Sequence, residues 1–133
     1  MTLRHLLPHT IRKPFAKYSH GVLVEARSDL IFCSGQLGIA ADDVIPEDAA
    51  LQAELCFGNI AAILAEGGMG LADVVRLNAY VTDRAHMAAY MGVRDRLFPA
   101  PSPASTLMIV SGFTRPEFKV EIEAVAARSR EIA

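Results

Sequence analysis

Residues 74–82 have the sequence VVRLNAYVT, and this stretch decides the fold. From residue 75 onward, apolar residues at odd positions alternate with polar or aromatic residues at even positions. This period of two predicts a β-strand that is buried on one face. Segments with helical periodicity flank it at residues 47–66 and 83–97. Because a helix between two strands permits a crossover connection, we expect a sheet with both parallel and antiparallel pairs.

Both helices have recognisable ends in the sequence. Pro46 suits the start of the first helix, and a glycine run at 67–70 stops it. This run lacks the lysine and the hydroxyl residue of a phosphate-binding loop, so we interpret it as a helix C-terminal turn. Asp83 is a suitable N-cap for the second helix, which extends to about Leu97.

Further strands are expected on both sides of this central unit. They lie at residues 3–7, 21–27 and 30–34 before the first helix, and at 106–110 and 119–126 after the second. The two-residue link at 28–29 predicts a hairpin. The element order is therefore β-β-β-α-β-α-β-β. We expect an α+β domain over residues 1–133, with a single mixed β-sheet of about six strands and two helices packed on one face.

Two helices leave the other face of such a sheet without cover. Several of the expected strands are apolar at nearly every position, and apolar residues make up 52% of the chain. Obligate subunit interfaces resemble a domain core cut in half. We therefore expect a second subunit to cover the open face of the sheet.

Charge and hydropathy limit the classes of partner. The formal net charge is −2, and the densest basic stretch, Arg12 to Lys17, is too sparse for a phosphate track. We expect no nucleic-acid partner. No apolar run is expected to reach the ~18 residues of a membrane span, and the first residues lack a signal-peptide pattern. A cytoplasmic location without membrane association is the expectation.

The sequence predicts neither a metal site nor a cofactor site. Cys33 and Cys56 lie among apolar residues without a CxxC pattern, which favours buried, reduced thiols. His5 and His9 are four residues apart, but their context is not helical and no third ligand is close in sequence. Dinucleotide-binding fingerprints and nucleophile motifs do not occur.

Two polar features remain as candidates for a functional site. Residues 33–36, CSGQ, place small polar groups at the end of a strand, where sites collect in α/β folds. Glu121 and Glu123 are two apart on the last strand and therefore share a face. Ordinary turn chemistry at the strand end and an exposed structural pair of carboxylates are the default explanations of these two features.

Six segments, in the same order, resemble the Rid/YjgF family. They are PFAKYSHGV at 14–22, FCSGQLG at 32–38, the Q-x(6)-NI pattern at 52–60, VVRLNAYVTD at 74–83, PAST at 103–106 and VEIEAVA at 120–126. The resemblance implies a homotrimer with a small-molecule site in each cleft between subunits. The best understood members hydrolyse reactive imines or enamines to keto acids and ammonia. They need no cofactor, since pyridoxal phosphate belongs to the enzymes upstream.

The resemblance also implies roles for individual residues. Tyr18 matches a tyrosine that lines the cleft, and Ser34 and Gly35 match the strand-end pair that meets the substrate. Cys33 lies beside this pair and is a further candidate for substrate contact. Glu121 matches a glutamate that positions water, a task that suits a carboxylate in a cleft. Glu121, Tyr18 and Ser34 are thus the predicted catalytic residues.

At two positions the chain departs from the family pattern. Deaminating members carry an arginine after the Pro-Ala pair, where it holds the substrate carboxylate as a bidentate fork. This chain has Ser105, which offers one donor and no charge. Met91 stands where the family usually has an asparagine. Both residues are predicted to contact the substrate, and a less charged or larger ligand is expected to suit them.

Three functions follow from these observations. The first is an enzyme, a hydrolase of C=N bonds with a substrate altered by Ser105. The second is a non-catalytic trimer that binds or senses a small molecule in the same cleft. The third is ribonuclease or translation-inhibitor activity, which has been attributed to some family members. The acidic balance of the chain argues against that third function.

Overall fold

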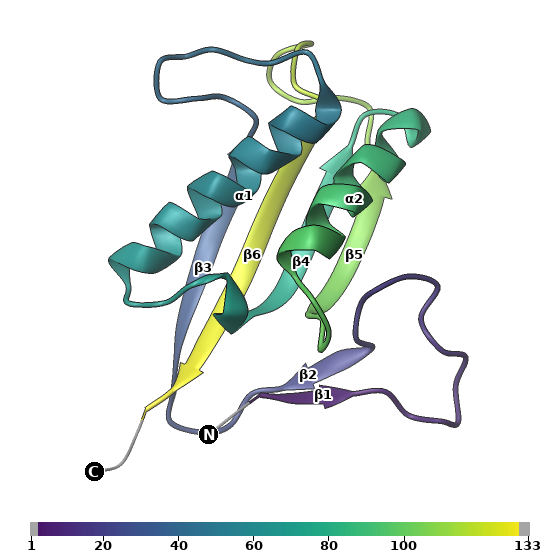
Figure 1. Cartoon of the computed structure of the whole chain (residues 1–133), viewed down its shortest axis with the longest axis vertical. Coiled ribbons are helices and arrows are strands. Elements are labelled where there is room, and N and C mark those ends of the chain that lie inside the picture. Colours follow the sequence, from purple (N-terminus) through teal and green to yellow (C-terminus); the bar gives the residue numbers. More distant parts are fainter. Residues whose placement is uncertain (1–2, 131–133) are drawn as a thin grey trace.

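The computed structural model describes residues 3–130 of the 133-residue chain. A four-stranded sheet carries two helices on one face, and a separate two-stranded hairpin lies beside one end of the sheet (Figure 1). The strands are β1 (Arg4–Leu6), β2 (Gly21–Leu23), β3 (Ser28–Leu37), β4 (Val74–Val81), β5 (Ala104–Ile109) and β6 (Val120–Ser129). The helices are α1 (Ala49–Glu66) and α2 (Met87–Leu97), with short 3-10 helices η1 (Leu71–Asp73) and η2 (Arg84–His86).

The predicted α+β class, element order and mixed sheet are confirmed. The order in the main sheet is β3-β6-β4-β5, with β4 parallel to β5 and antiparallel to β6. On β4, every odd residue from 75 to 81 is buried, as the alternation predicts. Across the helix layer, Phe57 packs against Tyr90 and Phe98, with ring centres 6.1 and 5.3 Å apart.

The six strands do not form one continuous sheet, and the hairpin predicted at 28–29 was wrong. β2 pairs with β1, whereas β3 begins at Ser28 and pairs with β6. Arg27, the residue before β3, lies in a turn and has a φ of 67°. A single parallel bridge between Ser19 and Ala104 links the segment before β2 to the main sheet.

Contrary to expectation, α1 is long and apolar enough to cross a membrane by length and composition alone. Its buried side includes Phe57, Ile60 and Leu64, which pack in the core against the sheet. The core helix of a folded domain satisfies the same criteria, and α1 has this position. Asp48 caps α1 by accepting a hydrogen bond from the Ala50 amide at 2.7 Å.

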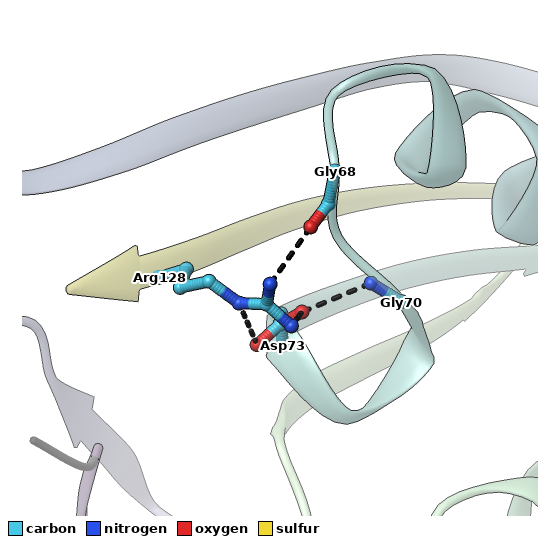
Figure 2. Close-up of polar contacts among 4 residues, drawn as sticks. All are labelled: Gly68, Gly70, Asp73 and Arg128. Carbon is cyan, nitrogen blue, oxygen red and sulfur yellow. Dashed lines mark hydrogen bonds and ion pairs between the residues drawn. The ribbon is translucent and has the colours of Figure 1, made fainter. Parts of the chain in front are cut away.

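The turn after α1 confirms the interpretation of the glycine run. The amides of Gly67 and Met69 both donate to the Leu64 carbonyl, which closes the helix. Arg128 near the end of β6 holds this turn to the sheet (Figure 2). Its Nη1 donates to the Gly68 carbonyl at 2.8 Å, and its Nη2 contacts the Asp73 carboxylate at 3.0 Å.

Gln52 connects the first turn of α1 to the chain that enters β6. Its side chain is 0% exposed. The amide nitrogen donates to the carbonyls of Pro46 and Glu117 at 2.7 and 2.9 Å, and the amide oxygen accepts from the Lys119 amide at 2.8 Å. A glycine is required at residue 38, because a Cβ there would overlap the Gln52 side chain.

We predict that Gln52→Leu lowers the free energy of unfolding by about 3 kcal/mol or more. The substitution leaves one buried amide and two carbonyls without partners, and each such group costs about 1–3 kcal/mol. Gln36→Leu is the matched control, since the Gln36 side chain makes one hydrogen bond, to the Ser34 carbonyl. Urea unfolding of both variants measures the effect. Equal stabilities of the Gln52→Leu and Gln36→Leu variants would contradict the role of Gln52 in connecting α1 to β6.

Candidate functional site

A β-bulge on β3 brings Gly35 against Glu121. Cys33 pairs with Ala124 and Gln36 with Ile122, so β3 contains one residue more than β6 between these pairs. The Glu121 carboxylate lies over Gly35, where a Cβ would be 2.9 Å from the carboxyl carbon. A glycine is therefore required for this carboxylate position.

Glu121 and Glu123 share the open face of the sheet but differ in their partners. Glu123 accepts hydrogen bonds from Asn78 Nδ2 at 3.1 Å and from the Tyr80 hydroxyl at 3.0 Å. Among residues 3–130, the Glu121 carboxylate has neither a hydrogen bond nor an ion pair. Burial, and secondly the negative charge of Glu123, raise the pKa of Glu121. Glu121 is thus the carboxylate that is available for a ligand or for water.

The hydrogen-bonded network continues across the open face toward β5. Arg76 donates to Asn78 Oδ1 at 3.0 Å and to the Thr106 hydroxyl at 2.6 Å. The hydrogen bond from Tyr80 to Glu123 is the largest cause that raises the pKa of Tyr80. These side chains fix Glu123 in place beside Glu121.

The predicted residues next to Gly35 point in different directions. Ser34 is exposed on the same face as Glu121. Cys33 belongs to the core on the helix side, and burial raises the pKa of its thiol. Burial raises the pKa of the other thiol, Cys56, to about 12, and its sulfur donates to the Gln36 carbonyl at 3.1 Å. Neither thiol shares the face of Glu121.

Tyr18 lies beyond the edge strand β5. The amide of the neighbouring Ser19 donates to the Pro103 carbonyl at 3.1 Å, which holds this segment next to the start of β5. The half-buried Tyr18 lines a cleft of about 400 Å³ together with Lys17, Asp95 and the 99–102 loop. This cleft opens beside the C-terminal half of α2.

Ser105 lies under α2, on the helix side of the sheet. It pairs with the buried Leu77 of β4, and the two side chains share a face. Its Oγ and the Tyr90 hydroxyl are both buried, and neither has a hydrogen-bond partner within the described part of the chain. Met91 follows Tyr90 on α2 and packs against the core.

The chain therefore divides the predicted site into two groups. The first, which we call the bulge group, consists of Ser34, Gly35 and Glu121. The second, the α2 group, consists of Tyr18, Met91 and Ser105. Glu121 on β6 pairs with Tyr80 on β4, and Tyr80 pairs with Met108 on β5. Ser105 is therefore two strands and three residues away from Glu121. With strands ~4.8 Å apart and ~3.3 Å per residue, the two Cα atoms are separated by about 14 Å. Their side chains lie on opposite faces of the sheet.

Three neighbours of the α2 group were missed at the level of sequence. Tyr90, Arg94 and Asp95 surround Ser105 or line the cleft beside Tyr18. The four-residue spacing of Tyr90 and Arg94 places both on one side of a helix. This spacing is the feature of the sequence that could have identified Tyr90 and Arg94 as neighbours, although it does not reveal that Arg94 is buried.

Comparisons with known proteins identify the family. A family model described as Endoribonuclease L-PSP matches residues 10–128. The crystal structure of YyfB from Yersinia pestis, described as a Rid family protein of unknown function, aligns with a TM-score of 0.82. It is 26% identical, and the alignment covers 96% of this chain and all of that one. This chain belongs to the Rid/YjgF family.

Other Rid/YjgF relatives include proteins of known name. DfrA of Myxococcus xanthus is 34% identical over 116 residues, which cover 86% of this chain and 87% of DfrA. TdcF of Escherichia coli, named as a reactive intermediate deaminase, is 30% identical over 75% of this chain and 80% of its own length. A crystal structure of TdcF with bound serine aligns with a TM-score of 0.71 at 29% identity, covering 87% and 91% of the two chains.

We predict that Gly35→Ala lowers the pKa of Glu121 toward its ordinary value. The new methyl group displaces the carboxylate from the bulge into water, which removes part of the burial that raises this pKa. An NMR titration of the Glu121 side chain measures the shift. Gly58→Ala is the control, because a Cβ at that position on α1 meets nothing within 4 Å. An unchanged Glu121 titration in Gly35→Ala would contradict the contact.

Proposed function

We propose that this protein is a homotrimer that hydrolyses C=N bonds of small imines or enamines in clefts between its subunits. The observation that carries the proposal is the division of the site. Glu121 of the bulge group and Ser105 of the α2 group lie on opposite faces of one sheet, with their Cα atoms about 14 Å apart. A cleft that contains both groups must take one from each of two neighbouring subunits.

The chemistry assigned to Glu121 is proton transfer to and from water. The carboxylate accepts a proton from water as the water oxygen bonds to the imine carbon, and it passes this proton to the imine nitrogen, which gives a carbinolamine. The carboxylate then takes the proton of the carbinolamine hydroxyl as the C=O bond forms, and it delivers this second proton to the nitrogen as the C–N bond breaks and ammonia leaves. The net reaction is imine plus water to carbonyl compound plus ammonia. A raised pKa suits both steps, since the group serves first as base and then as acid.

Ser34 and Tyr18 are assigned to hold the substrate. The Ser34 hydroxyl adjoins the bulge on the exposed side, and its orientation suits a polar group bound next to Glu121. The Tyr18 hydroxyl accepts a hydrogen bond from the Phe15 amide at 3.3 Å and retains its own proton as a donor. The name of TdcF supports a deaminase function at the level of the family.

We predict that Glu121→Gln lowers the rate of imine hydrolysis by about 10²–10⁴-fold, the usual contribution of a positioned acid–base group. Ammonia release from imines that an amino-acid oxidase or an amine oxidase forms in situ measures the rate. Glu54→Gln, which changes an exposed carboxylate on α1, is the control. No acceleration by the wild-type protein with any imine would contradict the proposal.

The pH dependence of this activity has a definite sign. The attacking step needs the ionised carboxylate, and burial raises its pKa. The rate should therefore fall as the pH decreases through the raised Glu121 pKa, at a higher pH than for an ordinary glutamate. In Gly35→Ala the same decline should move to lower pH. A decline at the same pH in both proteins would contradict the role of Glu121.

The open face of the sheet supports the proposed trimer. Phe32 is 72% exposed on this face, and Leu30 and Met108 are also exposed there. We predict that Phe32→Glu dissociates the assembly, because the interface would bury a carboxylate without a partner. Light scattering should give three subunit masses for the wild type and one for this variant. Leu51→Glu on the outer side of α1 should remain trimeric, and a monomeric wild type would contradict the proposal.

A non-catalytic binding protein is the second candidate. Ser105 favours it, because a serine presents no charge to a substrate. A thermal-shift screen identifies a ligand, since a bound ligand raises the melting temperature. Consumption of that ligand during the assay would contradict the non-catalytic candidate. A cytoplasmic location and the lack of a nucleic-acid or membrane partner stay predictions, and some relatives are named as mitochondrial proteins.

A further inference from the structure

Cys56 on α1 contacts both of the strands that bring Gly35 and Glu121 together. Its side chain is 0% exposed, and its sulfur donates to the Gln36 carbonyl on β3 at 3.1 Å. A second, longer contact joins the sulfur to the Val120 carbonyl on β6 at 3.8 Å. Gln36 follows Gly35 in the chain, and Val120 precedes Glu121. The thiol therefore lies on the helix side of the sheet, behind the place where Gly35 meets Glu121.

The bulge on β3 depends on hydrogen bonds from side chains. A β-bulge disrupts the regular ladder, and carbonyl groups there need other partners. The Gln36 amide nitrogen donates to the Ser34 carbonyl at 3.1 Å, and the Cys56 thiol donates to the Gln36 carbonyl. Of these two bonds, only the one from Cys56 comes from another element. It therefore ties the bulge to α1.

The spacing along α1 explains how the thiol reaches this place. Cys56 follows Gln52 by four residues, so the two side chains lie on the same face of the helix, one turn apart. Gln52 holds the chain that enters β6, through the Glu117 carbonyl and the Lys119 amide. In successive turns of α1, these two side chains fix the start of β6 and then the bulge of β3.

Glu121 is close enough to Cys56 for its charge to affect the thiol. Burial is the main cause that raises the pKa of Cys56 to about 12, and the negative charge of Glu121 is the second. The thiol therefore keeps its proton at neutral pH and remains a hydrogen-bond donor. Glu123 on the same strand and Tyr80 on β4 are the other titratable groups near Glu121.

We propose that Cys56 is a positioning residue for Glu121. Its S–H holds the Gln36 carbonyl, which fixes the bulge and keeps Gly35 against the carboxylate. Without this hydrogen bond the bulge relaxes, and water reaches the carboxylate from the side of Gly35. The role rests on the proposed hydrolase function, since Cys56 acts through the group that is assigned to proton transfer.

The alternative role of Cys56 is that of an ordinary core residue, because a free cysteine behaves as a small apolar side chain in many proteins. Three variants separate the two roles. Cys56→Ser keeps a hydrogen-bond donor, whereas Cys56→Ala removes it and leaves a space. Cys56→Val removes the donor and fills that space, which keeps the test decisive where Cys56→Ala fails to fold.

We predict that an NMR titration gives a lower Glu121 pKa in Cys56→Ala and Cys56→Val, and a wild-type pKa in Cys56→Ser. The sign follows because a carboxylate that gains water loses part of the burial that raises its pKa. In the hydrolysis assay, kcat should fall by about 10-fold or more in the two variants without a donor, part of the usual contribution of a positioned acid–base group. Their decline in rate at acid pH should also move to lower pH.

Ile60→Val is the matched control on the next turn of α1. Ile60 is 0% exposed and belongs to the same core, so the loss of a methylene lowers stability there without removing a hydrogen bond. The Glu121 titration should be unchanged in this control. Equal titrations in the wild type, Cys56→Ala and Cys56→Val would overturn the proposal, as would a shift in Cys56→Ser as large as in Cys56→Ala.

The two proposals can fail separately, because the titration needs no substrate. If the Glu121 pKa falls in Cys56→Ala and recovers in Cys56→Ser but no imine is hydrolysed, Cys56 positions the carboxylate and the hydrolase function fails. If imines are hydrolysed and the Glu121 titration is the same in every variant, the hydrolase function stands and the role of Cys56 fails. In the expected result, the pKa and kcat both recover in Cys56→Ser.

Discussion

The two helices of this chain pack on one face of its four-stranded sheet, and the properties of the other face follow from that constraint. The helix side is a conventional core built from the odd residues of β4 and the apolar side of α1. The open side combines exposed Phe32 and Met108 with a hydrogen-bonded polar network. A surface of this composition suits a subunit interface that also contains a ligand site, and an interface is where the two groups of the site can meet.

On the open face, the contact with Gly35 distinguishes the candidate catalytic carboxylate, Glu121, from the structural carboxylate, Glu123. Glu123 is fixed by Asn78 and Tyr80, whereas Glu121 lies against the Gly35 backbone without a partner among residues 3–130. The bulge on β3 makes this approach possible. We therefore assign the catalytic role to Glu121, whose carboxylate makes no hydrogen bond within residues 3–130.

The sequence predicted the parts of the fold that depend on local patterns. Alternation along residues 74–82 identified β4, and the glycine run after α1 identified the end of that helix. The pairing of β2 was not predictable, because its partner is a strand at residues 4–6 and not its neighbour in sequence, β3. The local pattern could not distinguish Glu121 from Glu123, since their surroundings come from β3 and β4, and only the family resemblance selected Glu121. The surroundings of Ser105 were missed for the same reason, because Tyr90 and Arg94 reach it only through the packing of α2.

The central claim is that each site combines the bulge group of one subunit with the α2 group of its neighbour. Mixed trimers, refolded from equal amounts of Glu121→Gln and Tyr18→Ala subunits, test it most directly. Each variant alone should be nearly inactive. In the mixture, about one quarter of the clefts should receive an intact group from each neighbour, and imine hydrolysis should return to about that fraction of the wild-type rate. Mixed trimers that remain as inactive as the separate variants would contradict the account.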